Sequence, residues 1–296
     1  HKELTQFNHR RLSPTTPYAG WKEDLKRDME ALLLEGEMLE TELKAISDLA
    51  ARAPTDVDGF MEWFQNLEKT GPGQHDPLFD FLAEKATTEQ MRWFIQQEVA
   101  GEAGFEDLTA LTQVKFPTQP KLEMARNYWD EMGRGVERGM HGPMLGMVAQ
   151  ELGLSEPDID SVVTESLALA NILTAFASNR RYAYHSVGAL GVIELTAPGR
   201  ATKVHQGLKR LGLSNEGQRY YSLHAVIDIR HSNDWNKEVI RPLLEQNPEV
   251  ARSLAEGALL RLYAGARCFD RYREELMGEK SEGKDESPAL LGALLH

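Results

Sequence analysis

Most of the chain consists of stretches in which apolar residues recur every three or four positions. In residues 21–53 the leucines follow this spacing among Glu and Lys, which predicts an amphipathic helix or a helical hairpin broken near Gly36. Residues 88–113, 121–132 and 248–276 carry similar patterns. No stretch combines strict apolar–polar alternation with a hairpin turn, so β-strands are not expected. The pattern predicts an all-α bundle of roughly eight to ten helices.

The middle of the chain is more apolar. Residues 162–195 form a long apolar run that we expect Pro198 to close, because proline interrupts helices. A helix that stops at Gly212 follows, then helices at 216–231 and around 235–245. This order predicts a buried centre built from the second half of the chain.

The composition changes too little along the chain to indicate two domains. We expect a single all-helical domain over residues 1–296, in which 1–85 form an N-terminal helical flank. The core that carries the candidate site spans 86–245, and a closing helix spans 246–276. Residues 277–296 begin polar and rich in Gly and Ser, as a frayed tail does.

Charge and hydropathy exclude two classes of partner. The net charge is −13 and the pI is near 5.2, which argues against a nucleic-acid partner because phosphate backbones are bound mainly by Lys and Arg. No apolar run reaches the roughly 18 residues that cross a membrane. We therefore expect a protein with a small-molecule substrate and no membrane or nucleic-acid partner.

Cys268 is the only cysteine. An intramolecular disulfide is therefore impossible, and a cysteine-rich zinc or iron–sulfur site is excluded. Any bound metal must be held by histidine and carboxylate. This cysteine usage is typical of a cytoplasmic protein.

The stretch "HAVIDIRH" contains the densest group of titratable residues. His224, Asp228 and His231 stand at i, i+4 and i+7, which places them within about 60° of one another on a helix face. Asp228 lies between Ile227 and Ile229, so we expect it to be buried. Buried carboxylates need a partner. The three groups either share a cation or form a hydrogen-bonded trio, and this motif alone favours the trio.

A second carboxylate follows an entirely apolar run. Glu194 comes directly after "VGALGVI", and a glutamate in such a segment is costly unless it has a positive partner. Arg200 or an exposed orientation would explain it without a metal. Gly188 and Gly191 would let another helix approach closely, as in a crowded site.

Two further segments supply ligand-type side chains. Glu131, Glu137 and His141 lie within "DEMGRGVERGMH", where the glycines must bend the helix if Glu131 and His141 are to meet. Glu98 lies on the expected helix 88–113. Each segment alone has low specificity.

Together these segments offer three histidines and at least three carboxylates. Zinc needs four ligands and commonly uses thiolates or several histidines, whereas calcium and magnesium rarely bind three imidazoles. Carboxylate-rich sites with several histidines inside helix bundles suit a pair of iron or manganese ions. The two Glu-x-x-His repeats of ferritin-like proteins are absent from the sequence.

From about residue 85 to 245 the chain resembles the haem-oxygenase-like di-iron oxidases and oxygenases, a superfamily of iron-containing redox enzymes. Their telling signature is His-x3-Asp-x2-His on a late core helix, which "HAVIDIRH" matches. A Glu some thirty residues earlier, and an early Glu followed at short distance by His, are also present. The resemblance assigns the metal ligands as Glu131, His141, Glu194, His224, Asp228 and His231.

The chain departs from the family pattern in one place and leaves another open. Some members carry an extra glutamate three residues before the early histidine; here that position is Arg138, with Glu137 beside it. Members also draw a carboxylate from the first core helix. Glu98 matches that role, with Asp107 as the alternative.

The resemblance implies a haem-oxygenase-like multi-helix bundle that binds two iron ions (Fe2+/Fe3+) and uses O2 as co-substrate. Oxygen activation would proceed through a peroxo-di-iron(III) intermediate, followed by N-oxygenation, desaturation or C–C cleavage. The substrate would be a small amine, amino-acid-like or fatty-acid-like molecule, and a homodimer is expected. Candidates for the substrate pocket are Trp93, Arg181, Tyr182, Tyr184 and His185.

Two other function classes remain open from the sequence. One is a haem-oxygenase-fold protein without redox metal that acts as a hydrolase or binding protein, although Cys268 lacks the aspartate-rich surroundings of a nucleophile. The other is a helical interaction protein whose His–Asp–His stripe is structural.

Overall fold

The fold is all-helical. A computed structural model describes residues 1–101, 104–155 and 158–278. Thirteen α-helices and no β-strand form within these residues, so the predicted all-α class is confirmed. The expected frayed tail lies outside the described residues from position 279 on. In chain order the helices are α1 (Lys2–Leu12), α2 (Trp21–Ala50), α3 (Val57–Thr70), α4 (Pro77–Glu84), α5 (Thr88–Gly101), α6 (Phe105–Thr112), α7 (Thr118–Glu131), α8 (His141–Glu151), α9 (Thr164–Ser178), α10 (Ala183–Arg210), α11 (Asn215–Trp235), α12 (Arg241–Gln246) and α13 (Ala251–Met277).

Two predicted segments have different boundaries from those expected. The helix α2 is continuous through Gly36, where an added Cβ would meet no atom within 4 Å, so the suggested break is wrong. Conversely, the expected segment 88–113 is divided into α5 and α6. Gly104 lies at this division with φ of 70°, a left-handed conformation that glycine adopts without steric cost.

The expectation that Pro198 ends a helix is also wrong. Helix α10 continues through Pro198 to Arg210. A proline inside a helix costs about 3 kcal/mol, but buried residues on both sides of it, Leu195 and Val204 among them, hold α10 against its neighbours. The break falls earlier, at Asn179, whose extended backbone ends α9 and whose side chain caps the next turn.

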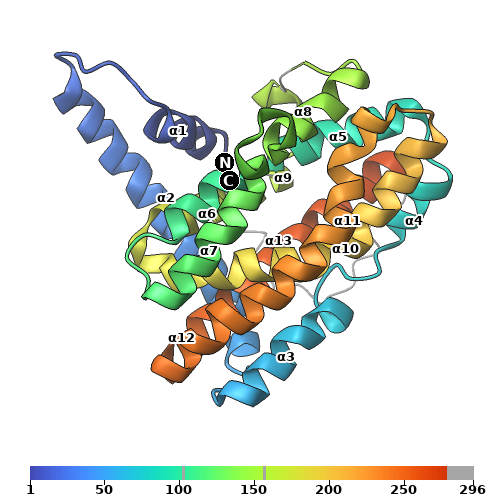
Figure 1. The fold of residues 1–296 in the computed structure, drawn as a ribbon. Helices are drawn as coiled ribbons and strands as arrows, with labels where there is room; N and C mark the ends of the chain where they lie inside the picture. Colours follow the sequence, from blue (N-terminus) through green and yellow to red (C-terminus); the bar gives the residue numbers. More distant parts are fainter. Residues whose placement is uncertain (102–103, 156–157, 279–296) are drawn as a thin grey trace.

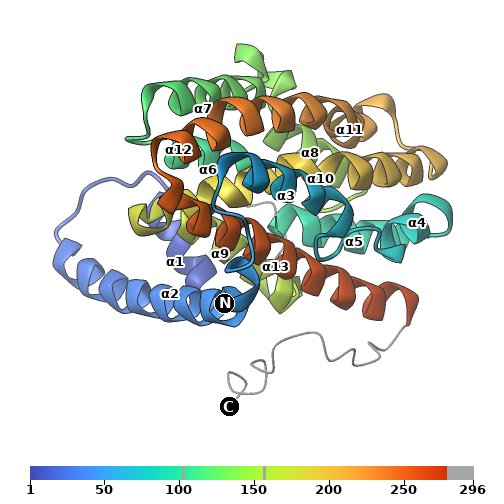
Figure 2. The same cartoon turned by 90° about the horizontal axis from the view of Figure 1, so that it is seen from below.

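Helix α10 forms the centre of the molecule. It packs against α11 on one side and α13 on the other, as Figures 1 and 2 show. At the crossing with α13, a Cβ on Gly188 would lie 2.0 Å from the Leu254 carbonyl oxygen, and one on Gly257 would lie 1.9 Å from that of His185. The expected close approach at Gly188 is therefore confirmed, and it brings α13 against the helix that carries Glu194.

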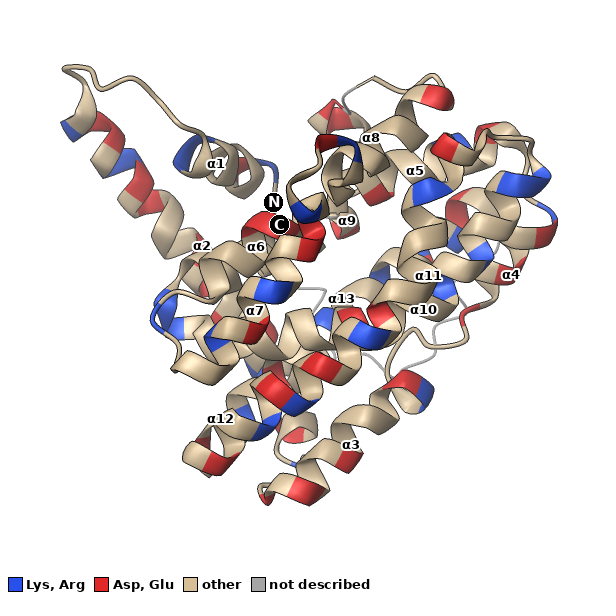
Figure 3. Ribbon diagram, viewed as in Figure 1, with Lys and Arg blue, Asp and Glu red and all other residues tan. Residues whose placement is uncertain are grey.

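Charged residues are spread over the outer faces of the bundle, as Figure 3 shows. Acidic and basic residues are interspersed over most helices (Figure 3). The N-terminal half of α2, however, extends away from the body beside α1 (Figure 1) and exposes Trp21, Leu25, Met29 and Leu33 along one face. None of the helices within the described ranges combines the length and apolar character required to cross a membrane.

Candidate metal centre

The end of α7 and the start of α8 bring an acid and an imidazole together. Glu131 closes α7, His141 opens α8, and the Glu131 Oε2 to His141 Nδ1 distance is 2.5 Å. The intervening loop folds back on itself, so that Met132 and Met140 form an isolated bridge. Gly133 permits this fold: its φ is 61°, and a Cβ there would lie 2.3 Å from the Gly139 carbonyl carbon. The helix therefore ends and restarts rather than bending.

Helix α11 presents the His–Asp–His stripe to the same place. Asp228 is 3% and His231 4% exposed, and His224 is half-buried. Asp228 is buried as expected, but the apolar residues next to it in sequence are not the reason. Ile229 is 54% exposed, because adjacent residues on a helix point about 100° apart.

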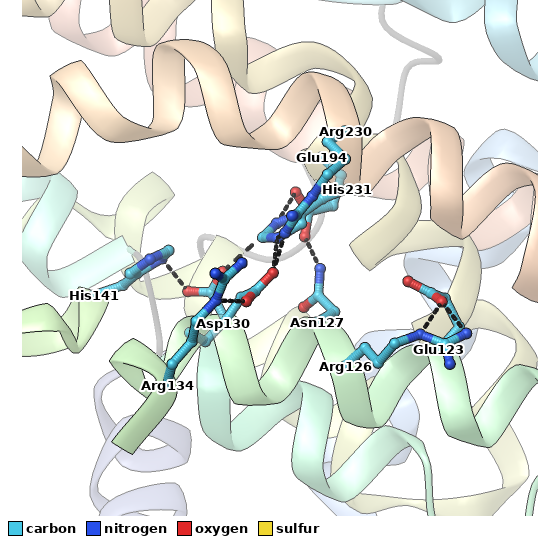
Figure 4. A network of polar contacts seen from close by, with 10 residues as sticks. Glu123, Arg126, Asn127, Asp130, Arg134, His141, Glu194, Arg230 and His231 are labelled. Carbon is cyan, nitrogen blue, oxygen red and sulfur yellow. Dashed lines mark hydrogen bonds and ion pairs between the residues drawn. The ribbon is translucent and has the colours of Figure 1, made fainter. Parts of the chain in front are cut away.

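His231 lies among three carboxylates. Its Nδ1 is 3.5 Å from Glu194 Oε2 and 3.9 Å from Glu131 Oε1. Its Nε2–H donates to Asp130 Oδ2 at 3.2 Å, as Figure 4 shows. Asn127 on α7 donates to the other oxygen of Glu194 at 2.6 Å. The Asp130 contact thus orients the ring so that Nδ1 faces the two glutamates.

Asp130 is itself held by two arginines. Arg134 donates to Asp130 Oδ1 at 2.6 Å, and Arg230 pairs with Oδ2 (Figure 4). Burial tends to raise the Asp130 pKa, but the hydrogen bonds of Arg134 and His231 and the charge of Arg230 lower it below its usual value. A carboxylate that orients a histidine in this way is typical of the surroundings of metal sites.

His224 is oriented through the backbone. Its Nδ1–H donates to the Tyr220 carbonyl oxygen at 2.7 Å, which leaves Nε2 as the acceptor nitrogen. The His224 and His141 rings lie with their centroids 4.6 Å apart and nearly perpendicular. One potential ligand atom from each of Glu131, His141 and His224 lies within 4.8 Å of the others.

A second such group shares the same glutamate. Glu131, Glu194 and His231 also offer three ligand atoms within 4.8 Å of one another. Glu131 therefore belongs to both groups, with Oε2 toward His141 and Oε1 toward His231. Carboxylates that bridge two metal ions have this placement in helix-bundle metal sites.

Burial and crowding shift the carboxyl groups toward their neutral forms. Burial, and next the charge of Glu194, raise the pKa of both Glu131 and Asp228 well above the usual range. Arg200 partly opposes the shift at Asp228. Several carboxylates held this close are unfavourable without a cation among them.

The three histidines shift in opposite directions. Burial lowers the pKa of His141 and of His224 to about 4, and the neighbouring imidazoles add to the effect. At His231 burial is outweighed by the hydrogen bonds and charges of Glu194, Asp130 and Glu131, which raise the pKa to about 9. At neutral pH the metal-free chain therefore has neutral His141 and His224 side chains, whereas the carboxylates around His231 keep that imidazole protonated.

Several polar atoms of this group are buried without hydrogen bonds. Asp228 Oδ1 has no hydrogen-bond partner within the described chain, and His141 Nδ1 and His231 Nδ1 have none beyond the glutamate oxygens that face them. Buried polar atoms are nearly always satisfied, so each such atom calls for an explanation. A bound cation is one, provided that it displaces the proton of His231, and a histidine–carboxylate donor set suits iron or manganese. The residues present therefore fit a metal pair.

The remaining predicted ligands lie elsewhere. Asp107 and Glu137 are exposed, and neither contacts the group described above. Glu98 lines the adjoining cavity, but its neighbours there are Arg261, Arg200 and Tyr272 rather than the histidines. The structure does not bring these three residues together with the histidines.

Glu106 on α6, a glutamate that the sequence did not single out, lies beside the start of α8. Its Oε1 would lie 2.8 Å from a Cβ on Gly142, the residue after His141, and its buried Oε2 has no hydrogen-bond partner in the described chain. Its charge also acts on Glu131 and His141. No sequence signal separates Glu106 from Asp107, because their orientation depends on the turn at Gly104 that begins α6.

The cavity beside the group has a different lining from the predicted one. It holds about 150 Å³ and is lined by residues of α4 through α11 and of α13, including Glu131, Glu194, His224 and Asp228. None of the five residues expected to line a substrate pocket does so; Tyr182 and His185 instead contact Glu40 and Glu256. Three of the five, Arg181, Tyr182 and His185, follow the break at Asn179 and line a separate pocket with Glu40 and Glu256.

Comparisons with known proteins agree with this geometry. A family model described as iron-containing redox enzyme matches residues 92–266. A search of curated proteins found no match.

Two solved structures are similar in fold. One, from Shewanella denitrificans OS217, is a domain of unknown function with a heme oxygenase-like fold; it is 14% identical with a TM-score of 0.51, over 76% of this chain and 93% of that one. The other is a Cadd-like protein of unknown function from Nostoc punctiforme PCC 73102, 15% identical with a TM-score of 0.50, over 82% and 99%. The fold is therefore haem-oxygenase-like, and since the family match covers more than half of the chain, the protein belongs to the family of iron-containing redox enzymes.

Proposed function

We propose that the protein is a non-haem di-iron oxidase or oxygenase that uses O2 to oxidise a small molecule. One observation carries the proposal. Two groups of potential ligands share Glu131, and its two oxygens face different histidines, His141 and His231. A carboxylate placed between two such groups suits two cations rather than one.

The proposed ligands divide between the two positions. Glu131, His141 and His224 would hold one ion, and Glu131, Glu194 and His231 the other. Asp228 lies on the same face of α11, and the charges of Glu194 and Glu131 act on it, so it would complete the set. Ferrous ions held there would supply the electrons that reduce O2.

The protein's own contribution is orientation and exclusion of water. Tyr220 and Asp130 fix the rings of His224 and His231, so that one nitrogen of each faces the carboxylates. Asn127 holds one oxygen of Glu194 and leaves the other toward His231. Leucine, isoleucine and phenylalanine side chains form part of the lining of the adjoining cavity and would help to keep bulk water away from a reactive oxidant.

A hydrolase built on the cysteine is less well supported. Cys268 lines the cavity but is buried, and burial together with the Glu98 charge raises its thiol pKa to about 12. The nucleophilic form of cysteine is the thiolate, which is scarce at neutral pH under these conditions.

Oxygen consumption tests the proposal directly. The iron-loaded protein should consume O2 when reduced, and His231→Ala or Glu194→Ala should lose at least nine-tenths of that rate. His205→Ala is the matched control, because His205 bonds Gln218 outside the site. Equal oxygen consumption in all three variants would overturn the proposal.

We also propose that the partner of the exposed face on α2 is a second copy of the chain. Trp21, Leu25, Met29, Leu32 and Leu33 recur at helical spacing, and each is at least 45% exposed. Charges of both signs flank this stripe, as a helix pairing with its own antiparallel copy requires. Light scattering should give twice the chain mass for the native protein and the monomer mass for Leu25→Glu. A native monomer would contradict a homodimer.

A further inference from the structure

The cavity beside the candidate metal centre contains a second set of charged side chains. Glu98 on α5, Arg200 on α10 and Arg261 on α13 line the same 150 Å³ cavity as Glu194 and Asp228. Arg200 stands six residues beyond Glu194 on α10, which is about 9 Å along the helix axis. The three helices thus bring charges from distant parts of the sequence to one region of the cavity, apart from the candidate metal ligands.

Both arginines lack an acidic partner at contact distance. Within the described residues neither guanidinium lies within 4.0 Å of a carboxylate oxygen, whereas Arg267 on the same helix as Arg261 pairs with Glu42 at 3.0 Å. Arg200 donates one hydrogen bond, to Thr196 Oγ1 at 3.0 Å on its own helix. Arg261 Nε is buried and donates none in the part of the chain described. Guanidinium groups in such surroundings are costly unless an anion joins them.

The two guanidinium groups repel one another. Burial, and then the charge of Arg261, lower the pKa of Arg200 to about 9, so Arg200 remains positive at neutral pH. Burial raises the pKa of Glu98, and the two arginines oppose that shift. The charges of Glu98 and Asp228 act on Arg200 as well, but no carboxylate oxygen of the described residues lies between the two guanidinium groups at contact distance. An anionic ligand group placed between them would offset their mutual repulsion.

The size and lining of the cavity restrict what carries that charge. A cavity of about 150 Å³ admits a molecule of roughly benzene size. Leu169, Leu173, Ile193 and Val204 supply an apolar surface that suits a short hydrocarbon stem. Guanidinium groups bind carboxylates in a planar, two-point arrangement.

We propose that Arg200 and Arg261 bind the carboxylate of a small monocarboxylic acid, whose hydrocarbon stem lies along the apolar lining toward Glu194 and Asp228. The acid has a short stem of about hexanoate size. Binding of the acid is independent of iron, whereas its role as the substrate rests on the proposed function. The arginines act as positioning and specificity-determining residues: they hold the carboxylate about a helix turn or more from the ligand group, so that stem carbons lie nearest to it.

Ligand binding to the full chain tests the carboxylate preference. Calorimetry with hexanoate, hexanamide, hexylamine and inorganic phosphate should be run at pH 7, on metal-free protein and again after anaerobic addition of ferrous iron. Hexanoate should bind at least tenfold more tightly than each of the other three in both states. Equal or tighter binding of hexanamide, hexylamine or phosphate would overturn the assignment of Arg200 and Arg261 as a carboxylate site.

Substitutions test the residues. Arg200→Gln and Arg261→Gln should each weaken hexanoate binding at least tenfold, while Arg267→Gln, the control on the same helix as Arg261, leaves it unchanged. Glu98→Gln should bind hexanoate at least as tightly as the native chain, because it removes the competing negative charge. Weaker binding in Glu98→Gln, or equal losses in Arg267→Gln, would refute the proposal.

The two proposals fail in different ways. If the protein takes up no iron but still binds hexanoate through Arg200 and Arg261, only the di-iron function is contradicted. If the protein binds two iron ions but binds hexanoate and hexanamide equally tightly, only the carboxylate site at Arg200 and Arg261 is contradicted.

Discussion

Replacing Asp228 by leucine should stabilise the metal-free protein while removing a proposed metal ligand. Asp228 is 3% exposed, and its Oδ1 has no hydrogen-bond partner in the described chain. A buried polar atom left unpaired costs about 1–3 kcal/mol, and leucine has a similar length without the polar atoms. We therefore expect a gain of about 1–3 kcal/mol in unfolding free energy, or roughly 2–10 °C in Tm.

Asp130→Leu is the matched control. Asp130 accepts hydrogen bonds from Arg134 and His231 and pairs with Arg230, so its loss leaves three donors without their acceptor. We expect this variant to lose stability, by about 1–3 kcal/mol. The same substitution thus changes stability in opposite directions at two aspartates near one centre.

Urea unfolding and thermal unfolding followed by circular dichroism, with a chelator and then with ferrous or manganous ion, measure both effects. The native chain should gain Tm on adding metal, and Asp228→Leu should gain much less. Two results would refute the reasoning. One is a loss of metal-free stability in Asp228→Leu as large as in Asp130→Leu; the other is an undiminished response of Asp228→Leu to metal.

Three further predictions concern pH, the extra carboxylate and the loop. Because the His231 pKa is about 9, a metal ion must displace a proton from His231 at neutral pH. The metal affinity should therefore rise about tenfold per pH unit for each proton released between pH 6 and 9. Equilibrium metal titrations that show no pH dependence would contradict this. Glu106→Gln should weaken binding of one of the two ions at least tenfold in anaerobic iron titrations, whereas Asp107→Asn, its exposed neighbour, should leave both unchanged. Gly133→Ala should lower both the Tm and the metal affinity, because the added Cβ would collide with Gly139. Gly146→Ala, in open space on α8, should raise the Tm slightly. Equal Tm changes in the two variants would contradict this account of the loop.

The fold class was predictable because helical periodicity persists in long amphipathic segments. Helix α2 and helix α13 follow from their leucine spacing. The helix through Pro198 was not predictable, because local sequence records the cost of an internal proline and not the packing of α10 between α11 and α13 that offsets it. Tertiary contacts decided that boundary.

The candidate site shows the same division. His224, Asp228 and His231 share a helix face, so their spacing alone places them together. The meeting of Glu131 with His141 depends on a loop that reverses at Gly133, and no spacing rule reports such a reversal.

Glu98 and Glu106 illustrate what sequence cannot separate. Both are glutamates in the expected segment 88–113, yet the turn at Gly104 directs Glu106 toward His141 and leaves Glu98 near Arg261. The proposed carboxylate site could not be predicted from the sequence either. Arg200 and Arg261 are sixty-one positions apart and line the same cavity only once α10 and α13 have packed together.

Iron stoichiometry tests the central claim most directly. Anaerobic titration of the full chain with ferrous iron, followed by metal analysis after desalting, should saturate at two ions per chain. Glu131→Gln should reduce this number, because both ligand groups share Glu131. Saturation at zero, or a preference for a single zinc ion, would contradict the di-iron account.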